Sequence, residues 1–270
     1  MARLSLSNAW DDSKRIFARD GGLLTSVALA LFVLPEVVAV VVSPPTITTP
    51  TIEGRIIGLV AALIGVIGQL AIVRLALGPS TTVGSAIGHG FRRFPSMLGA
   101  LVLLGLGLLI ILVPIMAVLM AAGIVELPGG RPSPSFGVAV LVLAVACVFL
   151  AVKFIMTVPV ASAEDAGPWT VIKRSWTLTN GNYWPLFGLE VLLLVAAVVL
   201  LLAAQMVGAV IANVVGGDVT PFSVSALILA IFVAAAQAAF TVLASLMLAR
   251  IYAQLSGRAE AQPGVPTTGI

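Results

Sequence analysis

The sequence predicts an all-α, polytopic membrane protein with six transmembrane helices arranged as three hairpins, each preceded by an amphipathic interfacial helix. Apolar stretches of about 20 residues recur six times, which is the length an α-helix needs to cross about 30 Å of hydrocarbon. The 270 residues are 60% hydrophobic and 9% charged, whereas soluble domains are about one quarter charged. The third observation is an uneven distribution of basic residues along the chain.

Of the 14 lysines and arginines, twelve lie on one side of the predicted membrane: Arg3, Lys14, Arg15, Arg19, Arg74, Arg92, Arg93, Lys153, Lys173, Arg174, Arg250 and Arg258. Arg55 and Arg131 lie on the other side. The positive-inside rule therefore predicts that both termini are cytoplasmic. We expect a multi-pass protein of the bacterial inner (plasma) membrane.

The six predicted spans, in order, are residues 22–43, 56–77, 97–122, 137–160, 185–213 and 223–250. The connections after the first and third spans, residues 44–53 and 123–135, are rich in Pro, Thr, Ser and Gly and poor in positive charge. Such connections are typical of the non-cytoplasmic side. Residues 1–257 are predicted to form one six-helix membrane domain, followed by a disordered cytoplasmic tail over residues 258–270.

Apolar residues at three- and four-residue spacing predict an amphipathic helix before each hairpin. Its aromatic anchors are Trp10 in the first segment, Phe91 in the second and Trp176 in the third. The bases expected to meet lipid headgroups are Arg15, Arg92, Arg93, Lys173 and Arg174. Trp169, Ile172 and Trp176 are expected on one face of the third segment, with Lys173 opposite. Basic residues beside an aromatic face favour a helix that lies in the membrane interface. The unit repeats about every 80 residues.

Ionisable residues inside spans are costly and point first to function. Glu36 follows Pro35 in span one, where Pro35 cannot donate to the carbonyl of Leu31 and so predicts a kink. Glu36 is interpreted as a substrate or proton site, or as a carboxyl bonded to a neighbouring helix. Lys153 and Glu190 lie at comparable depth in adjacent spans, which predicts an ion pair that either serves function or fixes helix register.

Small residues recur along span two at Gly54, Gly58, Ala61, Gly65 and Gly68, which favours close helix packing. His89, the sole histidine, is expected on a solvated helix face. Asp165 is expected to cap the third amphipathic helix.

Catalytic signatures are missing from the sequence. There is no phosphate-binding loop, no HExxH helix and no Gly-x-Ser-x-Gly elbow. No second histidine or cysteine lies near His89 to share a metal ion. An enzyme is therefore the least favoured class, with no catalytic residue, metal or cofactor predicted. No basic stripe suggests nucleic acid as a partner.

One block is more specific than general hydrophobicity. It comprises residues 164–169 (EDAGPW), 172–179 (IKRSWTLT) and 181–184 (GNYW), together with Trp10 and residues 16–19. With these residues the chain resembles the bacterial glycerophosphoryl diester phosphodiesterase membrane-domain family, over nearly the whole length up to about Gly257. The resemblance implies a six-helix membrane domain of poorly defined function. We expect a stand-alone membrane domain without the hydrolase domain that some relatives carry, so no catalytic residue is transferred.

The predicted function is that of a non-enzymatic scaffold, partner subunit or membrane-homeostasis factor that contacts lipids. Its expected partners are membrane lipids, with another membrane protein or a second copy of the chain left open. The alternative is a small transporter or lipid translocator that uses Glu36, Glu190 and Lys153 in a central cavity.

Overall fold

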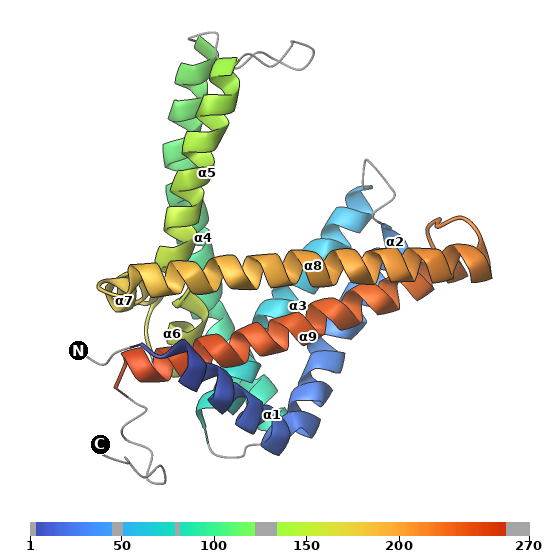
Figure 1. Ribbon diagram of the computed structural model, residues 1–270, viewed down its shortest axis with the longest axis horizontal. Helices are drawn as coiled ribbons and strands as arrows, with labels where there is room; N and C mark the ends of the chain where they lie inside the picture. Colours follow the sequence, from blue (N-terminus) through green and yellow to red (C-terminus); the bar gives the residue numbers. More distant parts are fainter. Residues whose placement is uncertain (1–3, 45–50, 79–81, 122–133, 258–270) are drawn as a thin grey trace.

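The computed structural model describes residues 4–44, 51–78, 82–121 and 134–257, and every regular element within them is a helix (Figure 1). In chain order the elements are α1 (Leu6–Ala28), the π-helical turn η1 (Leu29–Val33), α2 (Leu34–Val42), α3 (Ile52–Leu77), α4 (Val83–Ala121), α5 (Pro134–Phe154), α6 (Thr157–Ala163), α7 (Pro168–Thr179), α8 (Tyr183–Gly216) and α9 (Val224–Leu255). The predicted tail, residues 258–270, lies outside the described residues.

Six helical stretches of the described chain are long and apolar enough to cross a membrane: Leu6–Val42, Ile52–Leu77, Val83–Ala121, Val140–Ala163, Tyr183–Gly216 and Val224–Leu255. This confirms the predicted all-helical fold with six apolar helices. Several are longer than a straight crossing needs. At 1.5 Å per residue, the 34 residues of α8 extend about 51 Å, against about 30 Å of hydrocarbon.

The first long stretch departs from regular α-helix at two places. Asp20 departs from helical geometry, with φ −114° and ψ 16°, and divides the amphipathic start of α1 from its apolar continuation. Further on, η1 precedes Pro35, and the N–H of Leu34 bonds to the carbonyl of Leu29, five residues back. Because Pro35 has no N–H to donate, the interruption predicted there takes the form of a π-helical turn.

The predicted fourth span is not continuous. A single helix over residues 137–160 was expected, but α5 ends at Phe154 and α6 begins at Thr157. Pro159 cannot donate to the carbonyl of Ile155, and the carbonyl of Lys153 accepts from the hydroxyl of Ser175 on α7 at 3.1 Å. Broken helices occur inside membranes where neighbouring groups satisfy the freed backbone, as they do here.

The amphipathic segments differ in how they join the spans. The third forms a helix of its own, α7, between the extended residues Gly167 and Asn180. The second is not separate, because α4 runs from Val83 through Pro95 to Ala121 without a break.

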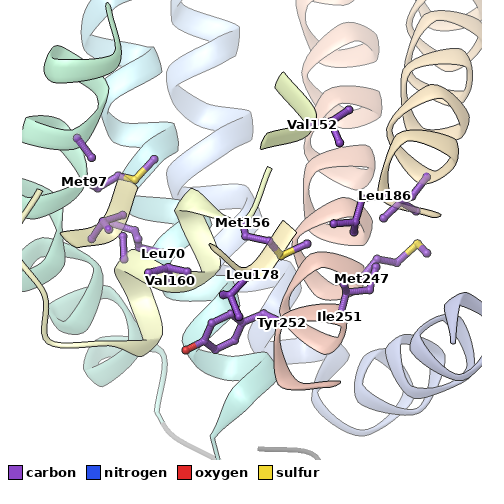
Figure 2. Packing of buried hydrophobic residues seen from close by; sticks show 14 of the residues in the cluster. Leu70, Met97, Val152, Met156, Val160, Leu178, Leu186, Met247, Ile251 and Tyr252 are labelled. Atoms are coloured by element: carbon purple, nitrogen blue, oxygen red, sulfur yellow. The ribbon is translucent and has the colours of Figure 1, made fainter. Parts of the chain in front are cut away.

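The described residues bury two hydrophobic clusters, of which one joins α1, η1, α3 and α9. The other lies at one end of the molecule, which we call the base. There α6 and α7 pack among α3, α4 and the last turns of α9. Figure 2 shows part of this core, in which Met156, Leu178 and Tyr252 come together with Met247 and Ile251 of α9. Hydrogen bonds between Ser5 and Gln254 tie the start of α1 to the end of α9 at the same base. The two ends of the described chain therefore lie close together at the base.

Away from the base the helices spread in different directions (Figure 1). The most extensive contact runs between α8 and α9, and α2 packs on both α3 and α9. The outer parts of α4 and α5 project away from the rest (Figure 1), and their apolar side chains are largely exposed. On α3, an added Cβ at Gly68 would lie 2.7 Å from the Phe32 ring. Gly54 and Gly65 also lie against neighbouring side chains, whereas Gly58 meets open space. Close packing at the small residues of α3 is thus confirmed at three of the four glycines.

Candidate functional site

Helix α7 presents two tryptophans and a lysine on its exposed side. Val171, Ser175 and Leu178 are buried against the core. Trp169 is 69% exposed and Trp176 is 38% exposed, and Lys173 between them is also exposed. Residues at positions i, i+4 and i+7 share one face of a helix, so the expectation that Lys173 lies opposite the tryptophans was wrong.

These three residues rim a cleft between α4, α5 and α7, which we call the α7 cleft. Its volume is about 550 Å³, and its apolar wall on α4 includes Leu104, Gly107 and Ile111. Lys173 is the one charged side chain among the residues that line it. Ligand sites in proteins commonly measure about 300–1,000 Å³. A long apolar trough with a cation at its rim matches the chemistry of an amphipathic anion.

A second cleft of about 520 Å³ lies between α1 and α9. The cleft is open because the residues that line it on α9 are small, among them Ala235 and Ala239. Lys14 of α1 lies at the rim of this cleft. Lys14 already pairs with Asp11 at 2.9 Å, and its ammonium lies 5.8 Å from the centre of the Trp10 ring. The cation at this second cleft is thus already paired with a carboxylate.

The five predicted headgroup-contacting bases fall into two groups. Arg92 and Lys173 are exposed and make no ion pair within the described residues, and the exposed Arg15 lies 3.4 Å from Asp12. Arg93 and Arg174 instead form ion pairs with acids of the α6–α7 connection. Arg93 pairs with Asp165, and Arg174 donates to Glu164 at 3.2 Å. Of the aromatic anchors, Trp10, Phe91 and Trp176 are all exposed.

The adjacent acids of the α6–α7 connection hold the base together. Glu164 accepts from Arg174 and from the buried hydroxyl of Tyr252 at 2.7 Å. Asp165 was expected to cap α7, but the N-cap residue is Gly167, which has no side chain to accept, and Asp165 binds Arg93 of α4 instead. The position of the helix start explains the difference, because Asp165 lies two residues before the N-cap position from which a side chain accepts from the first turn.

Lys153 does not pair with Glu190, which corrects the predicted ion pair. Its ammonium donates to the side-chain oxygen of Asn180 at 2.7 Å. Three rings surround it, with centres 4.9 Å away for Trp176 and 5.7 Å away for both Phe149 and Tyr183. The break after Phe154 brings the end of α5 against α7, so that aromatic faces replace the carboxylate as partners of the buried cation.

The two carboxyl groups that the sequence places inside predicted spans lie on separate helices. Glu36 is on α2 and Glu190 on α8, both half-buried. Within the described residues, no hydrogen bond or ion pair joins either group to Lys153. Neither of the two clefts is lined by Glu36, Glu190 or Lys153. The three residues predicted to share a cavity are therefore not brought together by these contacts.

His89 is not on a solvated face. Its Nε2 lies 2.9 Å from the carbonyl of Ser162, and the Ser162 hydroxyl donates in turn to the carbonyl of Leu70. The contact links α4 to α6 and α3. Helical periodicity placed His89 away from the apolar residues of its own helix, but it contained no information about α6.

Sequence reasoning missed Asn180 and Lys14. The separation of 27 residues between Lys153 and Asn180 gives no periodic signal. Lys14 was considered only as one of the twelve basic residues on one side of the predicted membrane. Its place three residues after Asp11 and four after Trp10 is a helical spacing that could have indicated both contacts.

The chain was also compared with known proteins. A family model described as "Domain of unknown function (DUF7847)" matches residues 4–255. No curated protein matches the chain, and no solved structure does.

Proposed function

The chain belongs to the DUF7847 family, and from this premise we propose that it is a non-enzymatic protein of the bacterial inner membrane that contacts lipids as a scaffold, partner subunit or membrane-homeostasis factor. The observation that carries the proposal is the exposed face of α7, where Lys173 lies between Trp169 and Trp176. Tryptophan favours the level of the lipid headgroups, and a basic residue beside it attracts anionic lipid.

The proposed orientation places the base at the cytoplasmic leaflet. Most of the positive charge belongs to this side of the sequence, and the positive-inside rule assigns such a side to the cytoplasm. The aromatic residues Tyr183, Trp184 and Phe187 at the start of α8 pack against one another. Trp184 is 76% exposed, which suits a ring at the boundary between water and lipid.

In this proposal three hairpins leave the base, each preceded by a segment in the interface. The bend at Asp20 supports such a role for the start of α1, and the isolated helix α7 supports it for the third segment. The lengths of α4, α8 and α9 fit a tilted path, because a helix longer than the bilayer is thick adapts by tilting.

A relationship to the glycerophosphoryl diester phosphodiesterase membrane domain remains part of the proposal. It rests on the block over residues 164–184, whose members Glu164, Arg174 and Trp176 make contacts that hold the base. The proposal assigns these residues structural roles.

The test removes the three bases that are exposed. The Arg15→Gln, Arg92→Gln and Lys173→Gln triple variant should retain less phosphatidylglycerol after purification in detergent, measured by native mass spectrometry against phosphatidylcholine. A base near a membrane surface contributes about 1 kcal/mol, or about fivefold in binding, for each residue. The control is Arg55→Gln, because Arg55 is also exposed but lies on the predicted opposite side. An unchanged lipid preference in the triple variant would refute the proposal.

Transport through Glu36, Glu190 and Lys153 remains the alternative prediction. It gains no support from Lys153, whose ammonium is occupied by Asn180 and three rings. Its own test is transport by purified protein in liposomes that is lost in Glu36→Gln.

A further inference from the structure

We infer that the α7 cleft binds one anionic phospholipid of the surrounding bilayer, with an acyl chain along α4 and the phosphate at Lys173. The inference rests on the proposed function and names the ligand class and the site. It adds that a single lipid molecule is held in a shaped cleft, whereas the proposed function requires only a basic, aromatic surface.

The shape and composition of the cleft fit an acyl chain. Its α4 wall runs from Leu103 to Ile111, over two helical turns, and consists of leucine, isoleucine and glycine at the lining positions. Leu150 and Phe154 of α5 close the opposite side. An added Cβ at Gly107 would meet no atom within 4 Å, so the absence of a side chain there leaves open space that faces the trough.

The charge at the rim fits a phosphate. Lys173 is exposed and makes no ion pair within the described residues. The neighbouring cations are already engaged, since Arg174 donates to Glu164 and Lys153 donates to Asn180. Lys173 is therefore the cation of this region that remains available to an anion. Trp169 and Trp176 stand one turn to either side of it and would cover the glycerol region of a bound lipid.

The α1–α9 cleft is the natural comparison. It has nearly the same volume and is also apolar, but its lysine, Lys14, is bonded to Asp11. An anionic headgroup there would compete with a carboxylate one turn away. The two clefts thus differ in whether their lysine is free to pair with an anion. For this reason we assign the anionic lipid to the α7 cleft.

Tryptophan fluorescence provides a direct readout. The chain has four tryptophans, and the double variant Trp10→Phe, Trp184→Phe keeps only Trp169 and Trp176 at the α7 cleft. In detergent micelles this two-tryptophan protein is titrated with phosphatidylglycerol or phosphatidylcholine that carries brominated acyl chains. Phosphatidylglycerol should quench the fluorescence saturably, and phosphatidylcholine should need a higher concentration.

Two further variants test the trough itself. Gly107→Phe, made in the two-tryptophan protein, should fill the cleft and abolish saturable quenching. Gly105→Phe is the matched control, because an added Cβ at Gly105 also meets open space and this residue does not line the cleft. Lys173→Gln should weaken phosphatidylglycerol binding about fivefold and leave phosphatidylcholine binding unchanged.

The outcomes separate the two proposals. Equal quenching curves for Gly107→Phe and Gly105→Phe, or equal affinity for the two lipids, would overturn the inference about the cleft. If the triple variant described above still loses phosphatidylglycerol in that case, the surface role stands without the cleft. Saturable quenching that Gly107→Phe removes, together with a triple variant that loses no more phosphatidylglycerol than Lys173→Gln alone, would instead retain the cleft and reject the surface role.

Discussion

The ammonium group of Lys153 lies 4.9 Å from the centre of the Trp176 ring. The lysine is 7% exposed and stands at the end of α5, whereas the tryptophan belongs to α7. Within the described residues, α5 makes its main helix contacts with α7 and α8. This cation–π contact therefore anchors a projecting helix to the base.

Replacing Trp176 tests that anchor. Trp176→Leu should lower the free energy of unfolding in detergent micelles by about 1–2 kcal/mol, because a desolvated cation loses its nearest ring. The control is Trp169→Leu on the same helix, where the ring is largely exposed and the change should stay within about 0.5 kcal/mol. Equal losses in the two variants would show that Lys153 does not depend on Trp176.

Removing one hydroxyl tests the polar contact at the base. Tyr252→Phe should destabilise the protein by about 1.5–3 kcal/mol, because the buried hydroxyl donates to the carboxylate of Glu164. Glu164→Gln keeps an acceptor for Tyr252 but removes the charge that faces Arg174. Glu164→Gln should lower the free energy of unfolding by less than Tyr252→Phe does, since the ion pair between Glu164 and Arg174 is partly exposed. Chemical denaturation of both variants decides the order, and a neutral Tyr252→Phe would contradict the prediction.

A pair of glycines on α4 tests the packing between helices. A Cβ at Gly90 would lie 2.6 Å from the backbone carbonyl of Ile67, whereas a Cβ at Gly88 would meet no atom within 4 Å. Gly90→Ala should therefore cost about 1–3 kcal/mol through overpacking. Gly88→Ala should be neutral or stabilising by up to about 1 kcal/mol, since alanine favours helix more than glycine does. Thermal unfolding of the two variants measures the difference. Equal unfolding temperatures for Gly90→Ala and Gly88→Ala would contradict the close contact between Gly90 and Ile67.

Site-directed labelling tests the proposed orientation. In a Cys147→Ser background, Asp218→Cys should react with a membrane-impermeant maleimide in cells with a permeable outer membrane. Ser7→Cys should react only after the inner membrane is opened. Both positions are exposed, so reactivity reports on sidedness rather than on burial. Labelling of Ser7→Cys while the inner membrane is intact would place the base on the periplasmic side and contradict the proposed orientation.

The apolar helices were predictable because their signal is local. Hydropathy alone located all six, and the predicted end of span two, residue 77, is the observed end of α3. The break between α5 and α6 was missed even though Pro159 lies inside the predicted span. A proline in an apolar run does not reveal whether neighbouring hydroxyls, here that of Ser175, satisfy the freed carbonyls.

The contacts of the candidate site were less predictable, because they join helices that are distant in sequence. The similar predicted depth of Lys153 and Glu190 in the membrane suggested that they pair. Depth does not determine which helices face one another or in which direction a side chain points. The direction in which α5 meets α7 decides that Asn180 and the aromatic rings are nearer. Helical spacing alone places Lys173 on the same face as Trp169 and Trp176. Lys173 was nevertheless predicted to lie on the opposite face, and that prediction was wrong.

The bond between Arg250 and Asp12, 2.8 Å long, joins residues 238 positions apart. At roughly 5–20 residues per second, a ribosome would take about 12–48 s to add the chain between them. During translation the first helix must wait for the last one before the base can close. Slower synthesis lengthens the interval during which the first helix lacks its partner at the base.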